Sequence, residues 1–163
     1  NAKFIGNPVW TDISGARWTD ARWANVMSQM DWICIEHGAG DIGLTNGVTS
    51  TSGFALRSQN TYIDQLHALG VGVVNYADSS SAAVREYEMC RYLDKRDPVL
   101  NDMIGLWEEH VRWPSYDPIF DTDLGARVSR VDTNVAGAAI TATFQNGSLT
   151  YTPVTHASAA ITP

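Results

Sequence analysis

The chain is short of positive charge. Its 163 residues include 11 Lys or Arg and 18 Asp or Glu, which gives a formal net charge of -7. Nucleic-acid-binding domains are usually basic, so this balance argues against a nucleic-acid partner. No apolar run approaches the roughly 18 residues of a membrane span, so no membrane partner is expected. The chain shows no recognisable signal peptide and starts at Asn1 rather than at methionine, so the sequence leaves its localisation open.

Cysteine is also scarce. Cys34 lies in an apolar run and Cys90 on the apolar stripe of an expected helix. Two buried thiols are therefore favoured over a disulfide, and the cysteines and histidines lack the spacing of a zinc site. The Gly-x-Ser-x-Gly pattern of a serine-hydrolase nucleophile is missing as well. These absences imply no cofactor, although Glu36, His37 and Asp41 keep a metal site open as an alternative.

Two apolar runs end in polar groups. Residues 31–36 end in Glu36, and a loop rich in Gly, Ser, Thr and Asn follows as far as about residue 53. Residues 71–76 are followed by Asp78. Continuous apolar runs are typical of buried strands in α/β proteins. The ligand site of such folds lies at the carboxyl ends of the strands, and loops longer than about 12–15 residues are often functional.

Apolar runs alternate with helical periodicity along most of the chain, and this order predicts parallel strands connected by helices. We predict strands at 3–6, 31–36, 71–76 and 103–107, with helices at about 20–30, at 55–69 and from N-cap candidates at 78–81 to about 95. The expected inward positions are Trp23, Val26, Met27 and Met30, then Tyr62, Ile63, Leu66 and Leu69, then Val84, Tyr87, Cys90 and Leu93. Gly70 stands where a C-terminal glycine cap belongs.

The tail has a different pattern. Residues 111–125 are rich in Pro, Asp and aromatics and indicate a structured loop. Residues 140–144 and 148–151 alternate between apolar and polar, with Asn146 and Gly147 between them. An Asn-Gly pair between two alternating runs is a strong signal for a β-hairpin.

Glu36 is the best single catalytic candidate. A carboxylate at the end of a buried strand can be desolvated, which raises its pKa and suits it to general acid catalysis. Glycoside cleavage requires a second carboxylate, about 5–5.5 Å away for retention or about 6.5–9.5 Å away for inversion. Asp12 and Asp78, after the first and third strands, are the natural partners. The structural alternatives are an arginine partner for Glu36 and a helix-capping role for Asp78.

Aromatic residues gather near the same expected rim. The chain has six tryptophans and six tyrosines, and Trp10, Tyr76 and Trp107 fall close to strand ends, as does Asn75. Each aromatic residue taken alone is better explained by core packing than by sugar binding. Their grouping with carboxylates favours a set of sugar-binding residues made of Trp10, Asn75, Tyr76 and Trp107.

Three segments resemble the C-terminal half of a TIM-barrel glycoside hydrolase from a group defined largely by genome sequences. Phe4-Ile-Gly-Asn-Pro-Val-Trp-Thr-Asp12 resembles a barrel strand that usually reads Phe-Leu/Ile-Asp-Asn, with Gly6 in place of the strand-end aspartate. Residues 73–78 together with 85–93 resemble a late strand and its helix. The third segment, 123–126 through 144–153, resembles the Asp-Leu-Gly stretch and final hairpin of that group.

The resemblance implies an α/β fold: a partial (β/α) barrel of about four parallel strands over residues 1–125, with a C-terminal β-hairpin extension over 126–163. It implies glycosidase-like hydrolysis of an oligo- or polysaccharide. The alternative is a non-catalytic carbohydrate-binding or structural protein that retains the scaffold, which Gly6 favours. A whole barrel needs about 250 residues, so we expect a homo-oligomer or a complementary chain to cover the open edges.

Overall fold

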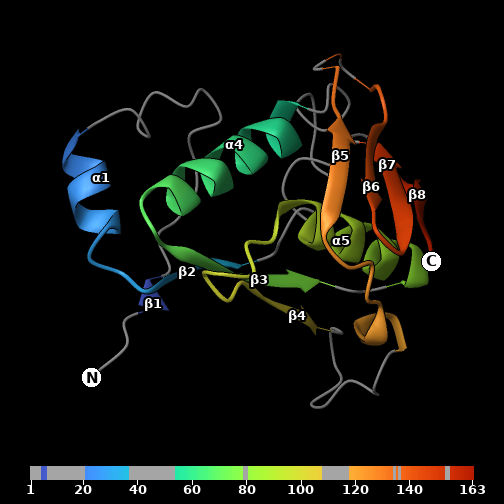
Figure 1. The fold of residues 1–163 in the computed structure, drawn as a ribbon. Coiled ribbons are helices and arrows are strands. Elements are labelled where there is room, and N and C mark those ends of the chain that lie inside the picture. The colour runs from blue at the N-terminus through green and yellow to red at the C-terminus, as the bar shows by residue number, and fades with distance from the viewer. Residues whose placement is uncertain are drawn as a thin grey trace.

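The computed structural model describes residues 5–6, 21–36, 54–78, 81–107, 118–133, 135, 137–152 and 155–163. These residues form two four-stranded sheets, one parallel and one antiparallel. Helix α5 (Ala82–Lys95) packs against strands of both sheets (Figure 1). The chain is therefore a mixed α/β structure in which one helix connects two sheets.

The parallel sheet joins the four predicted strands in chain order. Its strands are β1 (Ile5–Gly6), β2 (Trp32–Glu36), β3 (Gly72–Asp78) and β4 (Met103–Trp107), and each neighbouring pair is parallel. The predicted parallel strands and connecting helices are confirmed. The strand order ends at β1 on one side and at β4 on the other, and the barrel type of this sheet stays a prediction.

The described α-helices cover the same face of the parallel sheet. Ile33, Ile35 and Val73 form one core cluster with Met27 of α1 (Ala21–Met27) and with Tyr62, Ile63 and Leu66 of α4 (Phe54–Ala68). Ile35 pairs in register with Asn75, and Asn75 pairs with Ile104. Asn75 and Ile104 contact α5 and its cluster. Since register partners in a parallel sheet share a face, α1, α4 and α5 all lie on one side.

The first helix is shorter than predicted. It ends at Met27 rather than near Met30. Met27 is buried, and Trp23 and Met30 pack against its cluster as expected, but Val26 is 53% exposed. Neighbouring helical residues point about 100° apart, so the helix turns Val26 away when it buries Met27. The expected inward position of Val26 was wrong.

Local caps set the ends of the other helices. Gly70 has φ 77°, its N–H donates to the His67 carbonyl oxygen at 2.9 Å, and the next N–H, of Val71, donates to the Leu66 carbonyl oxygen at 3.0 Å. This pair of bonds is a Schellman motif, which glycine favours because it tolerates positive φ. At the start of α5, the Ser81 side chain accepts a hydrogen bond from the Val84 N–H at 3.3 Å.

The predicted hairpin is confirmed, but it is part of a larger sheet. β6 (Ile140–Phe144) and β7 (Gly147–Thr152) pair antiparallel, while β5 (Arg127–Val131) and β8 (Thr155–Thr162) add a strand on either side. The sequence did not predict β5 and β8. The expected loop at 111–125 contains a short 3-10 helix, η2 (Pro118–Asp121). The second sheet starts just after the expected boundary at residue 125, and the division into two domains stays a prediction.

The second core cluster lies between α5 and the antiparallel sheet. From the helix it takes Tyr87, Met89, Cys90 and Leu93, and from the sheet Ile140, Ala142, Phe144, Leu149 and Tyr151. The rings of Tyr87 and Tyr151 meet edge to face with centroids 5.7 Å apart. Neither cysteine is part of a disulfide, as expected, but Cys34 is only partly buried.

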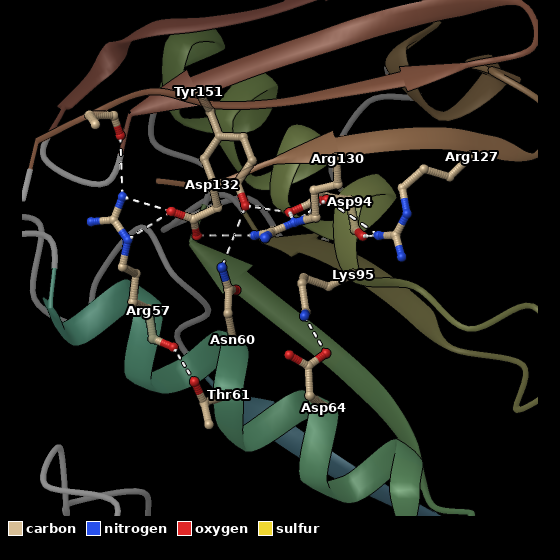
Figure 2. A network of polar contacts seen from close by, with 11 residues as sticks. Arg57, Asn60, Thr61, Asp64, Asp94, Lys95, Arg127, Arg130, Asp132 and Tyr151 are labelled. Atoms are coloured by element: carbon tan, nitrogen blue, oxygen red, sulfur yellow. Dashed lines mark hydrogen bonds and ion pairs between the residues drawn. The ribbon is translucent and has the colours of Figure 1, made fainter. Parts of the chain in front are cut away.

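A buried polar network joins α5 to the second sheet (Figure 2). The Asp94 side chain is fully buried. Its carboxylate accepts hydrogen bonds from the Tyr151 hydroxyl at 2.8 Å and from Arg130 Nε at 2.9 and 3.0 Å, and Arg127 Nη1 lies 3.4 Å away. Arg130 also contacts Asp132 at 3.4 Å, and Asp132 pairs with Arg57 of α4 at 3.1 Å. The network thus connects α4, α5 and the antiparallel sheet.

We predict that Asp94→Asn lowers the free energy of unfolding by about 2–4 kcal/mol, because it removes the charge that pairs with two arginines. Because the side chains of both arginines are partly exposed to solvent, the loss of unfolding free energy should be smaller than for a fully buried ion pair. Urea denaturation followed by circular dichroism measures the change. The matched control is Asp121→Asn on the exposed end of η2, which should cost less than about 0.5 kcal/mol. Equal unfolding midpoints for both variants would contradict the role given to Asp94.

Candidate functional site

The carboxyl edge of the parallel sheet brings four of the predicted site positions together. Glu36 of β2 pairs in register with Tyr76 of β3, and Asp78 of β3 pairs with Trp107 of β4. These four positions alternate along their strands with Ile35, Val73, Asn75 and Ile104, whose side chains face the helices. Since successive strand positions point to opposite faces, positions 36, 76, 78 and 107 belong to the face that α1, α4 and α5 do not cover.

The register also sets the spacing of the two candidate carboxylates on these strands. Neighbouring strands lie about 4.8 Å apart and each residue advances about 3.3 Å, so the Cα atoms of Glu36 and Asp78 are about 8 Å apart. A Cα spacing of this size is compatible with either carboxyl separation used in glycoside cleavage.

Other predicted positions lie outside the described residues. Trp10 and Asp12 are among them, as are His37 and Asp41 of the metal alternative. For Glu36, Tyr76, Asp78 and Trp107 the backbone is described and the side chains are not. Within the described part of the chain, no group of three or more His, Cys, Asp or Glu side chains is arranged to hold a metal ion.

The capping alternative for Asp78 does not apply. Asp78 is the last residue of β3, and α5 begins four residues later at Ala82. The N-cap is Ser81, whose hydroxyl oxygen accepts the hydrogen bond from the first turn of the helix. Asp78 is therefore not the N-cap of α5.

Asn75 lies in a different environment from the rim predicted for it. It is 2% exposed, beneath α5. Its Nδ2 donates to Glu88 Oε2 at 3.3 Å, and its Oδ1 accepts from Arg91 Nη2. A sugar contact through Asn75 would require this buried layer to open, so the structure gives Asn75 a role in holding α5 to β3.

Sequence reasoning missed the polar side of α5. Glu88, Arg91 and Asp94 recur every three residues and are all buried. Glu88 and Arg91 meet the parallel sheet at Asn75, whereas Asp94 meets the antiparallel sheet at Tyr151. The available signal was the three-residue spacing of charged residues along a helix that also carries an apolar stripe, since such residues are neighbours on one side.

Gly6 faces the helices rather than the candidate site. A Cβ atom built at Gly6 would lie 3.1 Å from Ile33 Cδ1 and 3.5 Å from Met30 Sδ. Gly6 also pairs in register with Ile33, which packs in the helical layer. In this register an aspartate at position 6 would not join the face that holds positions 36 and 78. The missing aspartate therefore does not by itself remove a carboxylate from that face.

The comparisons with known proteins identify no relative. No protein-family model, no curated protein and no solved structure matches this chain. No helix in the described ranges is long and apolar enough to cross a membrane. The assignment of the site therefore depends on the register and chemistry of the chain itself.

The two cysteines differ in their exposure to solvent. Burial raises the pKa of the Cys90 thiol to about 12, and its Sγ donates to the Ala160 carbonyl oxygen at 3.6 Å. Cys34 lies in β2, two residues before position 36 and on the same face of the sheet, and it is partly exposed.

We predict that iodoacetamide at pH 8 labels Cys34 at least about tenfold faster than Cys90, because burial shields the Cys90 thiol from solvent and raises its pKa. Peptide mass spectrometry over a time course measures both rates. In denaturant both thiols should label at similar rates. Equal labelling in the native protein would show that α5 is not held between the two sheets.

Proposed function

We propose that this chain is part of a carbohydrate-active protein that hydrolyses glycosidic bonds with paired strand-end carboxylates. The observation that carries the proposal is the register at the carboxyl edge of the sheet. It assigns two carboxylate positions, Glu36 and Asp78, and two aromatic positions, Tyr76 and Trp107, to the face without described helices. Carboxylates beside aromatic rings suit a sugar, which offers hydroxyl groups to the acids and a flat apolar face to the rings.

The topology supports a sheet of the barrel type. Sequential parallel strands joined by right-handed crossovers carry all their connecting helices on one face. Parallel sheets are rarely left open on the other face, and a (β/α) barrel covers it by closing the sheet on itself. In a closed barrel, positions 36, 76, 78 and 107 would fall on the inner side at the carboxyl end, where barrel enzymes hold their catalytic residues.

The proposed mechanism assigns one role to each carboxylate. Glu36 is the acid that protonates the glycosidic oxygen as the bond breaks, a role that a partly desolvated glutamate can fill near neutral pH. Asp78 or Asp12 is the second carboxylate, which either attacks the sugar carbon or activates a water. Tyr76, Trp107 and Trp10 hold the sugar rings. The proposed reaction needs no cofactor.

We predict that Glu36→Gln lowers kcat on neutral aryl glycosides or oligosaccharides by at least about 100-fold, since general acid catalysis contributes at least that much. The matched control is Asp31→Asn, the same chemical change next to the opposite end of β2. Asp31→Asn should retain hydrolysis, and calorimetry should show that both variants still bind the sugar.

The outcomes of this experiment separate the functional classes. Equal loss in both variants would indicate damage to β2 rather than removal of an acid. Binding without hydrolysis by the unaltered chain would favour the non-catalytic carbohydrate-binding alternative. Neither binding nor hydrolysis across a panel of neutral oligosaccharides would overturn the proposal.

The same topology underlies a proposal about assembly. Strands β1 and β4 end the sheet, and the apolar side chains of Ile5 and Met103 on these strands are 59% and 41% exposed. Unpaired edges and exposed apolar positions are normally covered. We propose that a second copy or a complementary chain covers them.

We therefore predict that the isolated chain either dimerises at low micromolar concentration or is only marginally stable as a monomer. Analytical ultracentrifugation gives the association state, and thermal denaturation gives the cooperativity of unfolding. A monomer with a sharp, cooperative melt would show that the chain covers its own sheet, and the partial-barrel proposal would be wrong.

A further inference from the structure

A cavity of about 380 Å³ lies on the side of the molecule away from the carboxyl edge. The later half of α4 and the end of α5 border it, and these helix ends lead into the starts of β3 and β4. The start of β5 and the end of β6 complete its wall, and Leu93 and Phe144 are among its apolar lining residues. The volume falls in the range of about 300–1,000 Å³ that is typical of small-molecule sites.

Cationic side chains are concentrated around this cavity in a chain that is acidic overall. Lys95, Arg96 and Arg127 line it and are three of the 11 Lys and Arg residues in the chain. The carboxylates in the same lining are Asp64 and Asp97. A local excess of positive charge in a protein of net charge -7 favours an anionic ligand at this place.

The two carboxylates already have partners. Asp64 pairs with Lys95, as Figure 2 shows. Asp97 Oδ1 accepts hydrogen bonds from the backbone N–H groups of Val99 at 2.8 Å and Leu100 at 3.3 Å. Asp97 is therefore engaged by the turn that follows α5, and within the described ranges it forms no ion pair with Arg96 or Arg127.

The cations keep donors for a further partner. Arg127 contacts Asp94 through Nη1 alone, and its side chain is 45% exposed. A guanidinium carries five N–H groups, and Asp94 is the contact of Arg127 found among the described residues, so donors remain for a ligand. Arg96 hydrogen-bonds the Tyr92 side chain, and no ion pair of Arg96 occurs among the described residues. Lys95 has three donors, of which Asp64 takes one.

We propose that this cavity is a binding site for a small molecule that carries a phosphate or carboxylate group. The anionic group would lie between Arg96 and Arg127, with Lys95 beside it, and the uncharged part of the ligand would rest on Leu93 and Phe144. Charge-assisted hydrogen bonds from arginine to such oxyanions are short and strong. The site does not depend on the proposed glycosidase function, because it uses none of the strand-end residues.

The state of Lys95 is consistent with this assignment. Burial lowers the pKa of Lys95, and the hydrogen bond that Lys95 donates to Asp64 offsets this only in part. A second anion near the ammonium group would stabilise its charged form. Binding of the ligand should therefore be accompanied by a higher pKa of Lys95.

The test is isothermal titration calorimetry of the full chain with inorganic phosphate and, separately, with malonate, at pH 7 and constant ionic strength in sodium chloride. Phosphate and malonate distinguish a phosphate site from a carboxylate site. The test variant is Arg96→Gln, and the matched control is Arg85→Gln, the same change on α5 outside the cavity lining. Arg127→Gln is a second test variant, with circular dichroism to confirm that it folds.

We expect one-site saturable binding of at least one of the two anions to the unaltered chain. Arg96→Gln should weaken it at least about tenfold, which corresponds to about 1.4 kcal/mol. Arg127→Gln should weaken it similarly, and Arg85→Gln should leave it unchanged. Absence of saturable binding by both anions, or equal binding by Arg96→Gln and Arg85→Gln, would overturn the proposal.

Discussion

The joining of the two sheets depends on the buried carboxylate of Asp94. A charge with no solvent contact is strongly destabilising unless it is paired and hydrogen-bonded. The partners of Asp94 are Arg127 and Arg130 of β5 and the hydroxyl of Tyr151 on β7. Helix α5 can therefore bury Asp94 only when the antiparallel sheet is in place. This dependence couples the burial of Asp94 on α5 to the presence of the antiparallel sheet.

The neighbouring polar residues of α5 carry an equivalent constraint toward the parallel sheet. Glu88 and Arg91 are both almost fully buried and meet the amide of Asn75 on β3. Apolar side chains of the helix, such as Tyr87 and Cys90, fill the space toward the second sheet. The helix thus holds β3 at a set position relative to the antiparallel sheet. Residues 76–78 follow Asn75 directly along the strand, so the same contacts position the carboxyl edge.

The parallel sheet could be predicted because its residues follow simple periodic rules. Each strand is a short apolar run, and Gly70 and Ser81 sit where helix caps are expected. The outer strands of the second sheet do not follow such rules. β5 turns Arg130 inward to a carboxylate rather than burying an apolar residue, and β8 presents small residues such as Ala159 to the core. Both strands owe their place to tertiary partners that local sequence does not contain.

The sequence did not reveal which face of the sheet each candidate residue occupies. Strand ends are visible in the sequence, whereas the face of a strand residue depends on which side the helices cover. Asn75 and Tyr76 are neighbours in sequence, yet Asn75 hydrogen-bonds to α5. Position 76 pairs in register with Glu36, and both positions belong to the opposite face of the sheet. One face of the sheet therefore contains the polar pairs that stabilise the fold. The other face contains the acidic and aromatic positions, which take no part in those pairs. Substitutions at these positions should therefore leave the packing of the helical layer intact.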